Sequence, residues 1–308
     1  MIVGKVCEIW RYPVKSMGGE RMDDSLVGES GIPGDRGWAL RDDDAGEIRG
    51  GKYLPELMRC SSSYREQPVD GLIPHVDITL PDGTRTASDA SDVNSRLSEL
   101  TGRRVSLWPL QPASNKAHYR RAQAGASIMG RLSRLPLVRP YLGDVIRLAR
   151  LEGATRKMFS REPDEPIPDF STTPSELFEF TSPPGTYFDA FPIHIVTTSS
   201  LNTMSQFNAA AVWDRRRFRP NFLIETGDEI EGLIEAGWGG RLLRLGEVEL
   251  KCEIPTVRCG MTMQAQQGLT KDPTVLRSIV RDAEQNLGVY ASVAKAGRVA
   301  LGDVLELL

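Results

Sequence analysis

Residues 248–262 have the sequence VELKCEIPTVRCGMT, and this stretch decides how the carboxy-terminal part of the chain can fold. Apolar side chains alternate with polar ones over its first half, which predicts a β-strand with one buried face. The run ends beside Arg258 and Cys259. A neighbouring positive charge favours the thiolate form of a cysteine, and the thiolate is the nucleophilic and metal-binding form. The stretch therefore predicts a strand that ends at a reactive thiol. A buried cysteine that only fills space is the alternative.

The composition excludes some classes of partner. The chain has 308 residues, of which 40% are hydrophobic, and a formal net charge of −3. This length allows two domains or one large one, with enough apolar residues for a substantial core. A mildly acidic chain gives no general electrostatic support for binding nucleic acid or a membrane surface. Its cations cluster locally, at Arg120-Arg121 and in residues 215–219, which suits a small anion better than a polymer.

The four cysteines are expected to stay reduced. The amino terminus lacks the apolar segment of a signal peptide, and no run reaches the ~18 apolar residues that indicate a membrane span. We therefore expect a cytoplasmic protein without a membrane span. Cys7 and Cys252 lie in strand-like runs and are expected in the core, whereas Cys60 has no assigned role. The spacing from Cys252 to Cys259 matches no structural zinc site, and the histidines are far apart in sequence.

Short strand patterns separated by glycine turns predict a mainly β fold with some helices (α+β) and a barrel-like architecture. Residues 1–110 are predicted to form an amino-terminal barrel-like domain and residues 181–308 a second domain. Residues 111–180 are predicted to connect them through short helices over 127–150 and a proline-rich loop over 162–174. The expected strands are Gly4–Trp10, Trp38–Leu40, Val76–Leu80, Arg85–Ala87, Val105–Leu110, Ile193–Thr197, Phe218–Glu225, Arg241–Leu245, Glu247–Ile254, Val289–Ala294 and Val304–Leu308. The expected helices are Ser91–Thr101, Ser199–Phe207 and Thr274–Asp282.

Several cations and amides are placed where they could bind an anion. A strand over Phe218–Glu225 would put Arg219 and Asn221 on one face, together with Arg217 just before it. Arginine binds phosphate through paired hydrogen bonds, and asparagine offers both a donor and an acceptor. Each of these residues alone could equally be an ordinary exposed charge, so their weight comes from the combination. The candidate residues are Lys15, Ser16, Arg36, Arg217, Arg219 and Asn221.

These motifs, in this order, resemble the MOSC family, named for the carboxy-terminal domain of molybdenum cofactor sulfurase. The amino-terminal part resembles the MOSC N-terminal β-barrel domain through residues 11–16 (RYPVKS) and 34–39 (GDRGWA). The carboxy-terminal part resembles the MOSC domain itself. The matching segments there are residues 197–201, 217–221, 258–259, 286–291 and 299–305. The resemblance covers most of the chain except residues 111–180, and it implies a MOSC β-barrel with an amino-terminal barrel-like domain.

The resemblance also implies a cofactor and a set of site residues. It points to relatives of the mitochondrial amidoxime-reducing component and of bacterial MOSC reductases, which bind a molybdopterin cofactor. In those proteins a cysteine thiolate is a ligand of the molybdenum, and Cys259 matches that cysteine. Other matching positions hold the phosphate and the pterin. With the flanking arginines, the expected cofactor-binding residues are Lys15, Ser16, Arg36, Thr197, Ser200, Arg217, Arg219, Asn221, Arg258 and Cys259.

The activity expected from this resemblance is the molybdenum-dependent reduction of a small N-hydroxylated or N-oxide substrate. Electrons would come from a separate ferredoxin-, flavodoxin- or cytochrome-like protein, since no ferredoxin-like cysteine cluster is present. Pyridoxal phosphate is not expected, because no cysteine desulfurase domain is present. Sulfur transfer or cofactor carriage through a persulfide on Cys259 is the alternative, and a silent module for another phosphate-bearing ligand is a third. Tungsten would fit the same ligands as molybdenum.

The chain departs from the reductases just after the cysteine. An acidic stretch with an Asp-Pro pair follows the cysteine motif in those enzymes, whereas residues 263–268 here are MQAQQG and the next carboxylate is Asp272. If that acid delivers protons, this protein needs another group or water for the step. Residues 111–180 are expected to cover the site and to influence the choice of substrate.

Overall fold

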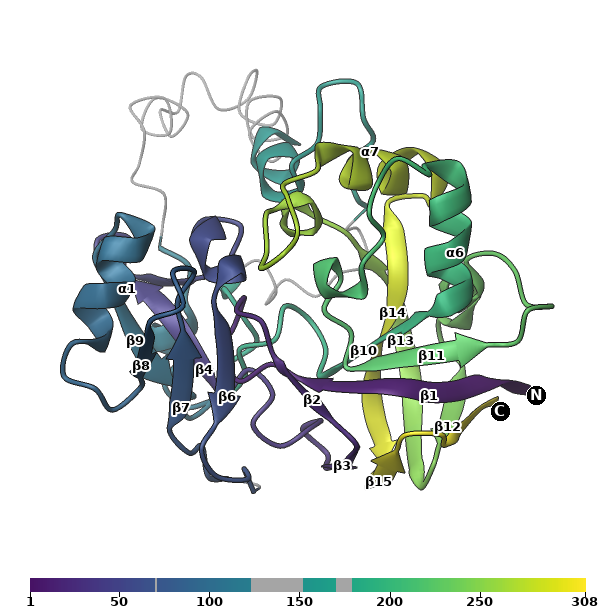
Figure 1. Ribbon diagram of the computed structural model, residues 1–308, viewed down its shortest axis with the longest axis horizontal. Helices are drawn as coiled ribbons and strands as arrows, with labels where there is room; N and C mark the ends of the chain where they lie inside the picture. The colour runs from purple at the N-terminus through teal and green to yellow at the C-terminus, as the bar shows by residue number, and fades with distance from the viewer. Residues whose placement is uncertain (70, 123–151, 170–178) are drawn as a thin grey trace, which may run out of the picture.

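The computed structural model describes residues 1–69, 71–122, 152–169 and 179–308. The fold is mainly β with some helices and contains a closed barrel, as the sequence predicted. Figure 1 shows the barrel strands on one side and a smaller group of strands, formed by the amino-terminal residues, on the other. The helices expected within 127–150 and the end of the proline-rich loop lie outside the described residues.

Seven strands of the described chain close the barrel in the order β11-β10-β14-β13-β12-β16-β1, and the pairing of β1 with β11 completes the circle. The first strand of the chain thus belongs to a barrel whose other strands all come from beyond residue 190 (Figure 1). All of these pairs are antiparallel except β10 with β11. The strands are β1 (Ile2–Arg11), β10 (Ile193–Thr197), β11 (Phe222–Thr226), β12 (Leu242–Leu245), β13 (Val248–Val257), β14 (Asn286–Lys295) and β16 (Val304–Leu307).

The barrel interior is filled by the alternating apolar side chains that define these strands. In β13 the residues Val248, Leu250 and Cys252 are fully buried, so the alternation in the sequence does mark the inward face. Cys252 lies in this core, as expected. Arg258 and Cys259 follow directly after the last residue of β13, so the motif lies at one end of the barrel.

The smaller amino-terminal part contains two three-stranded sheets. One is formed by β4 (Trp38–Asp42), β5 (Glu47–Arg49) and β9 (Val105–Pro109), and the other by β6 (Ser61–Tyr64), β7 (Val76–Thr79) and β8 (Arg85–Ala87). The helix α1 (Val93–Thr101) packs beside β9 and ends at Gly102, which has the left-handed φ of 62° expected of a C-cap glycine. Short elements complete this part, namely β2 (Glu20–Met22), β3 (Asp24–Val27), η1 (Pro55–Arg59) and α2 (Lys116–Tyr119). The strand β15 (Gly297–Ala300) pairs with β3 and so ties the carboxy-terminal residues to this part.

Two helices cover one side of the barrel, α6 (Thr198–Phe207) and α7 (Pro273–Asp282) (Figure 1). Thr197 caps α6 by accepting a hydrogen bond from the Ser200 amide, so the helix begins one residue before the expected Ser199. Asp272 caps α7 in the same way through the Thr274 amide. Three short 3-10 helices lie in the connections, η2 (Arg215–Arg217), η3 (Ile234–Trp238) and η4 (Gly260–Met263).

The strand expected over Phe218–Glu225 is wrong in its first half, because β11 begins only at Phe222. The arginines before it form the turn η2, and Arg219 has a left-handed φ of 56° that interrupts any extended chain. The alternation argument that put Arg217, Arg219 and Asn221 on one face of a strand therefore does not apply.

Candidate functional site

The chain that leaves β1 runs beside residues 36–38 and is fixed to them by main-chain hydrogen bonds. The Arg36 amide donates to the Tyr12 carbonyl over 2.7 Å, and the Lys15 amide donates to the Trp38 carbonyl over 2.8 Å. The turn before Arg36 requires Gly34, whose φ is 76° and whose missing Cβ would lie 2.6 Å from Pro68. Lys15 and Arg36, 21 positions apart in the chain, are therefore neighbours.

Arg36 and Arg219 both lie against the ring of Tyr12. Their guanidinium carbons are 4.8 and 4.1 Å from the ring centroid, respectively. Both residues have left-handed φ angles, 52° and 56°, which are costly for side chains of this kind and concentrate at functional sites. Burial, and then the charge of Arg36, lowers the pKa of Arg219 to about 10. Two guanidinium groups held together in this way favour an anionic ligand between or beside them.

Asn221 and Asp35 support Arg36 and Tyr12 through hydrogen bonds and an ion pair. The Asn221 amide group donates to the Asp35 carboxylate over 3.0 Å and accepts from the His194 main chain over 3.1 Å. The same carboxylate pairs with Arg36 and accepts from the Tyr12 amide. Asn221 is only 1% exposed, so its side chain positions Asp35 and Arg36.

Arg258 continues the group of cations toward the thiol. Its Nη2 donates to the Phe218 carbonyl over 2.9 Å, and its Nη1 lies 3.5 Å from His194 Nε2. The other ring nitrogen of His194 lies 3.5 Å from the Arg219 carbonyl, which links the two arginines through one imidazole. Burial and then the charge of Arg258 hold the pKa of His194 well below its usual range, so this imidazole is neutral.

Two donor atoms of these arginines are buried without a partner. They are Arg219 Nη2 and Arg258 Nε, and neither has a hydrogen bond to any described residue. A buried charged donor normally has a partner, because leaving it unpaired costs about 1–3 kcal/mol or more. A ligand with acceptor oxygens or ring nitrogens could satisfy both atoms.

Lys15 and Ser16 lie next to this group and already have protein partners. The Lys15 ammonium donates to the Tyr187 carbonyl over 2.7 Å and pairs with Asp189 over 2.6 Å. The Asp189 side chain is 63% exposed, so this pair borders solvent. The Ser16 hydroxyl accepts from the Gly51 amide, which leaves its own proton free to donate.

Cys259 begins the turn η4 and is half-buried. The segment 152–169 packs beside it. Arg161 donates to the Arg258 carbonyl over 3.0 Å, and a Cβ added to Gly260 would lie 2.2 Å from the Ser160 hydroxyl. Residues from the segment that the sequence placed between the domains thus do lie beside the cysteine. Among the described residues, no three His, Cys, Asp or Glu side chains are grouped so that they could hold a metal ion by themselves.

Three predicted site residues are engaged elsewhere. Arg217 is 2% exposed and bonds the carbonyls of Val212, Thr262, Gln264 and Thr270, so it fixes the loop that follows Cys259. Thr197 and Ser200 donate to the buried carboxylate of Glu235 over 2.8 and 2.6 Å. Their hydroxyls are thus used at the start of α6 and not beside the arginines.

Sequence reasoning missed Tyr12, Asp35, Asp189 and His194. Tyr12 stands inside the RYPVKS motif and Asp35 inside GDRGWA, so the signal for these two was adjacent to residues already chosen. Asp189 and His194 come from a separate segment and carry no local pattern.

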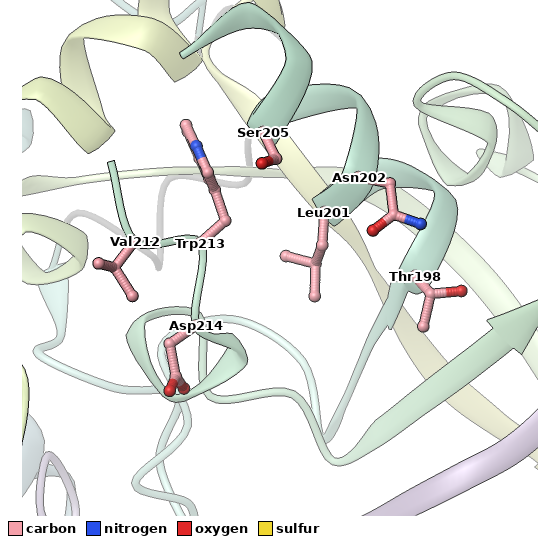
Figure 2. A pocket seen from close by; sticks show the side chains of 7 residues that line it. All are labelled: Thr198, Leu201, Asn202, Ser205, Val212, Trp213 and Asp214. Atoms are coloured by element: carbon pink, nitrogen blue, oxygen red, sulfur yellow. The ribbon is translucent and has the colours of Figure 1, made fainter. Parts of the chain in front are cut away.

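A separate cavity of about 380 Å³ lies between α6 and residues 212–214 (Figure 2). Thr198, Leu201, Asn202 and Ser205 of α6 line it from one side. It contains none of the arginines described above and no cysteine, so it is distinct from the candidate site.

Comparison with known sequences gives the family. The MOSC N-terminal beta barrel domain matches residues 3–115, and the MOSC domain matches residues 183–306. The chain belongs to the MOSC domain family. MOSC domains are associated with the molybdenum cofactor, and the family predicted from the motifs is confirmed.

Individual relatives are distant. Mitochondrial amidoxime reducing component 2 of Bos taurus is 26% identical over 323 residues, which cover 98% of this chain and 82% of that protein. The solved YuaD protein of Bacillus subtilis is 12% identical, with a TM-score of 0.41 over 99% of this chain and 94% of its own. YiiM of Escherichia coli is 16% identical, with a TM-score of 0.30 over 41% of this chain and 58% of its own. No helix in the described ranges is long and apolar enough to cross a membrane.

Proposed function

We propose that this MOSC protein binds a molybdenum cofactor and reduces small N-hydroxylated molecules, such as amidoximes. The observation that supports this most is the group formed by the partly buried Arg36 and Arg219 and the buried Arg258, which lies next to the half-buried Cys259 and contains two buried donor atoms without partners. The amidoxime-reducing name of the bovine relative supports the substrate class.

The residues present fit a group that combines an anionic phosphate with a soft metal. Arg219 and Arg36 would hold the phosphate, since guanidinium groups bind phosphate through several directed hydrogen bonds. The free proton of the Ser16 hydroxyl would add a donor. The unpartnered Nε of Arg258 would face the pterin side, and Cys259 would be the thiolate ligand of the molybdenum. Asn221, Asp35 and Tyr12 would position these groups without contacting the ligand.

When bound, the cofactor would supply two-electron reduction of the N–O bond of the substrate. Reduction of an N-hydroxylated group to the corresponding N–H compound and water consumes two electrons and two protons. The electrons would come from a separate electron-donor protein. Asp272, the first carboxylate after the cysteine motif, caps α7 through its bond to the Thr274 amide. This carboxylate is engaged at the helix cap, and water reaching the half-buried Cys259 region would supply the protons.

The test is turnover by protein expressed with a complete molybdenum cofactor pathway. Benzamidoxime would be the substrate and reduced methyl viologen the electron donor, with benzamidine measured by chromatography. We expect turnover by the wild type and by a Cys7→Ala control, which removes a thiol from the opposite end of the sequence, and loss of turnover in Cys259→Ala. A molybdenum-loaded wild type without activity would refute the proposal. A cyanide-labile sulfur on Cys259 in such a protein would then support the sulfur-transfer alternative.

A further inference from the structure

We propose that Arg161 positions the thiol of Cys259 by fixing the peptide bond that joins Arg258 to Cys259. Arg161 belongs to the segment 152–169, which would thereby be part of the site and not only a connection along the chain. This inference rests on the proposed function, because Cys259 is the proposed ligand of the molybdenum.

The Arg161 side chain is buried against the end of β13. It is 7% exposed, its Nη2 donates to the Arg258 carbonyl over 3.0 Å, and its Nε donates to the side-chain oxygen of Gln285 over 3.1 Å. The main-chain carbonyl of Gln285 in turn accepts from the Arg258 amide over 2.9 Å. Arg161 and Gln285 together therefore hold both the amide and the carbonyl of the residue directly before the cysteine.

Cys259 lies just beyond the last strand pairing of β13, which is at Val257. On its carboxyl side, its carbonyl accepts from the Thr262 amide over 3.2 Å and from the Thr262 hydroxyl over 3.1 Å. On its amino side, the peptide is held by the bond from Arg161 to the Arg258 carbonyl. The direction of the thiol is thus fixed by the turn η4 and by this guanidinium.

Arg161 is itself held in place by its own segment. Its amide donates to the Arg156 carbonyl over 2.9 Å, and its Nη1 donates to the Phe159 carbonyl over 2.8 Å. The guanidinium therefore bonds three uncharged oxygens from separate stretches of the chain. A planar group with five donors can hold several fixed acceptors at once, whereas the ammonium of a lysine is a point charge on a flexible stem.

Two further contacts keep the segment beside the cysteine. From α7, Arg277 bonds the Ser160 carbonyl and pairs with Glu165 over 2.6 Å. Ser160 also meets Gly260, where an added Cβ would lie 2.2 Å from the serine hydroxyl. The segment therefore contacts the chain on both sides of Cys259.

The backbone is left-handed at two of the residues in this arrangement. The φ angle is 54° at Ser160, directly before Arg161, and 70° at Gln285. Such angles are costly for residues other than glycine, persist only where the surroundings fix them, and concentrate at functional sites. The Gln285 amide is fixed by donating to the Ile279 carbonyl over 3.1 Å. These angles support a positioning role for the bonds between the two residues.

The experiment compares the wild type with Arg161→Met, Arg161→Lys and the control Arg244→Met. Methionine removes every donor, while lysine keeps one cationic donor. Arg244 is exposed on β12 and pairs with Glu306 over 3.2 Å, so its replacement makes the same chemical change away from the site. Urea unfolding shows that each variant is folded, and Arg161→Lys carries the comparison if Arg161→Met does not fold.

The first measurement is hydrogen exchange of the peptide over 257–264 in cofactor-free protein, followed by mass spectrometry. Exchange there reports local opening of the chain around Cys259. We expect exchange about tenfold faster in Arg161→Met, an intermediate rate in Arg161→Lys and the wild-type rate in Arg244→Met. The wild-type rate in both folded Arg161 variants would overturn the inference.

The second measurement uses molybdenum-loaded protein. Arg161→Met should keep its pterin, change the absorption spectrum of the bound molybdenum, and lower kcat for benzamidoxime about tenfold at an unchanged KM. Arg161→Lys should restore part of the spectrum and of kcat. A wild-type spectrum in Arg161→Met would overturn the inference even if KM changes, because the segment would then border the substrate without positioning the thiol.

The proposed function and this inference fail separately. A wild type that binds neither molybdenum nor pterin, or a loaded wild type that does not reduce benzamidoxime, would refute the proposed function. Hydrogen exchange of the cofactor-free variants would still decide whether Arg161 holds Cys259. Turnover by the wild type, together with a wild-type exchange rate and spectrum in Arg161→Met, would leave the proposed function intact and overturn the inference alone.

Discussion

Replacing Tyr12 by leucine should weaken cofactor binding by much more than replacing it by phenylalanine. The ring of Tyr12 lies 4.8 Å from the guanidinium of Arg36 and 4.1 Å from that of Arg219, while its hydroxyl donates to the Pro220 carbonyl over 3.0 Å. Phenylalanine keeps the ring and loses only the hydrogen bond. Leucine loses both, and the two arginines then repel each other without a surface that holds them.

The magnitude follows from these contacts. Each cation–ring contact contributes about 1 kcal/mol at a partly desolvated site, so losing two should cost about 2 kcal/mol, or about thirtyfold in affinity. The lost hydroxyl bond should lower the free energy of unfolding by about 1 kcal/mol in both variants. Leucine should add a further loss of stability from the cavity left by the smaller side chain.

The assay is the amount of pterin retained per chain after dialysis, read by fluorescence after oxidation. Urea unfolding in parallel shows that each variant is folded under the dialysis conditions. We expect Tyr12→Phe to retain nearly as much pterin as the wild type and folded Tyr12→Leu to retain far less. Equal retention by the two variants would show that the ring does not organise the arginines.

Three further predictions concern the loop around the cysteine. Arg217→Met should lower the free energy of unfolding, measured in urea, by about 3 kcal/mol, because it removes a buried cation that bonds four carbonyls. A change below about 1 kcal/mol would contradict this prediction. Iodoacetamide at pH 8 should label Cys259 before Cys7 in cofactor-free protein, because burial raises the pKa of the Cys7 thiol to about 11 and leaves only about 0.1% of it as thiolate. Peptide mass spectrometry that finds Cys7 labelled first would be evidence against this prediction. Gly260→Ala should speed proteolysis of residues 152–169 by displacing Ser160, and adding Ser160→Gly should reverse the effect; an unchanged digestion rate in the single variant would rule this contact out.

The sequence predicted strands such as β13 well because one face of the strand points into the barrel core. Val248, Leu250 and Cys252 alternate along β13, and all three are buried in the barrel core, as this pattern predicted. The helices expected over Ser91–Thr101 and Ser199–Phe207 also form, as α1 and α6, and each ends where the prediction placed its end. Local pattern and tertiary structure agree at these places, so prediction from the sequence succeeds.

The region before β11 shows where that reasoning fails. Alternation over Phe218–Glu225 predicted a strand, but the chain turns through η2 and Arg219 adopts a left-handed φ of 56°. Contacts with Tyr12 and Met17, about 200 positions away in the chain, hold Arg219 there. No local pattern reports such contacts.

The candidate site stays a prediction, and the same limit applies to it. Arg36 and Arg219 meet at the ring of Tyr12, and Arg258 is linked to Arg219 through His194, but the sequence could not show which polar side chains the protein itself uses. Arg217 bonds main-chain carbonyls, and Thr197 and Ser200 bond the buried Glu235, which lies 35 or more positions further along the chain. The reverse holds for Asp189, whose pairing with Lys15 over 174 positions has no signal in either segment.

The most direct test of the central claim is the molybdenum and pterin content of wild type and Cys259→Ala, both expressed with a complete cofactor pathway. If the arginines hold the pterin phosphate and the thiolate binds the metal, the wild type should contain both in stoichiometric amounts. The variant should keep pterin while its molybdenum is lost or changed in its absorption spectrum. A wild type with neither pterin nor molybdenum, or a variant whose metal content and spectrum match the wild type, would contradict the account.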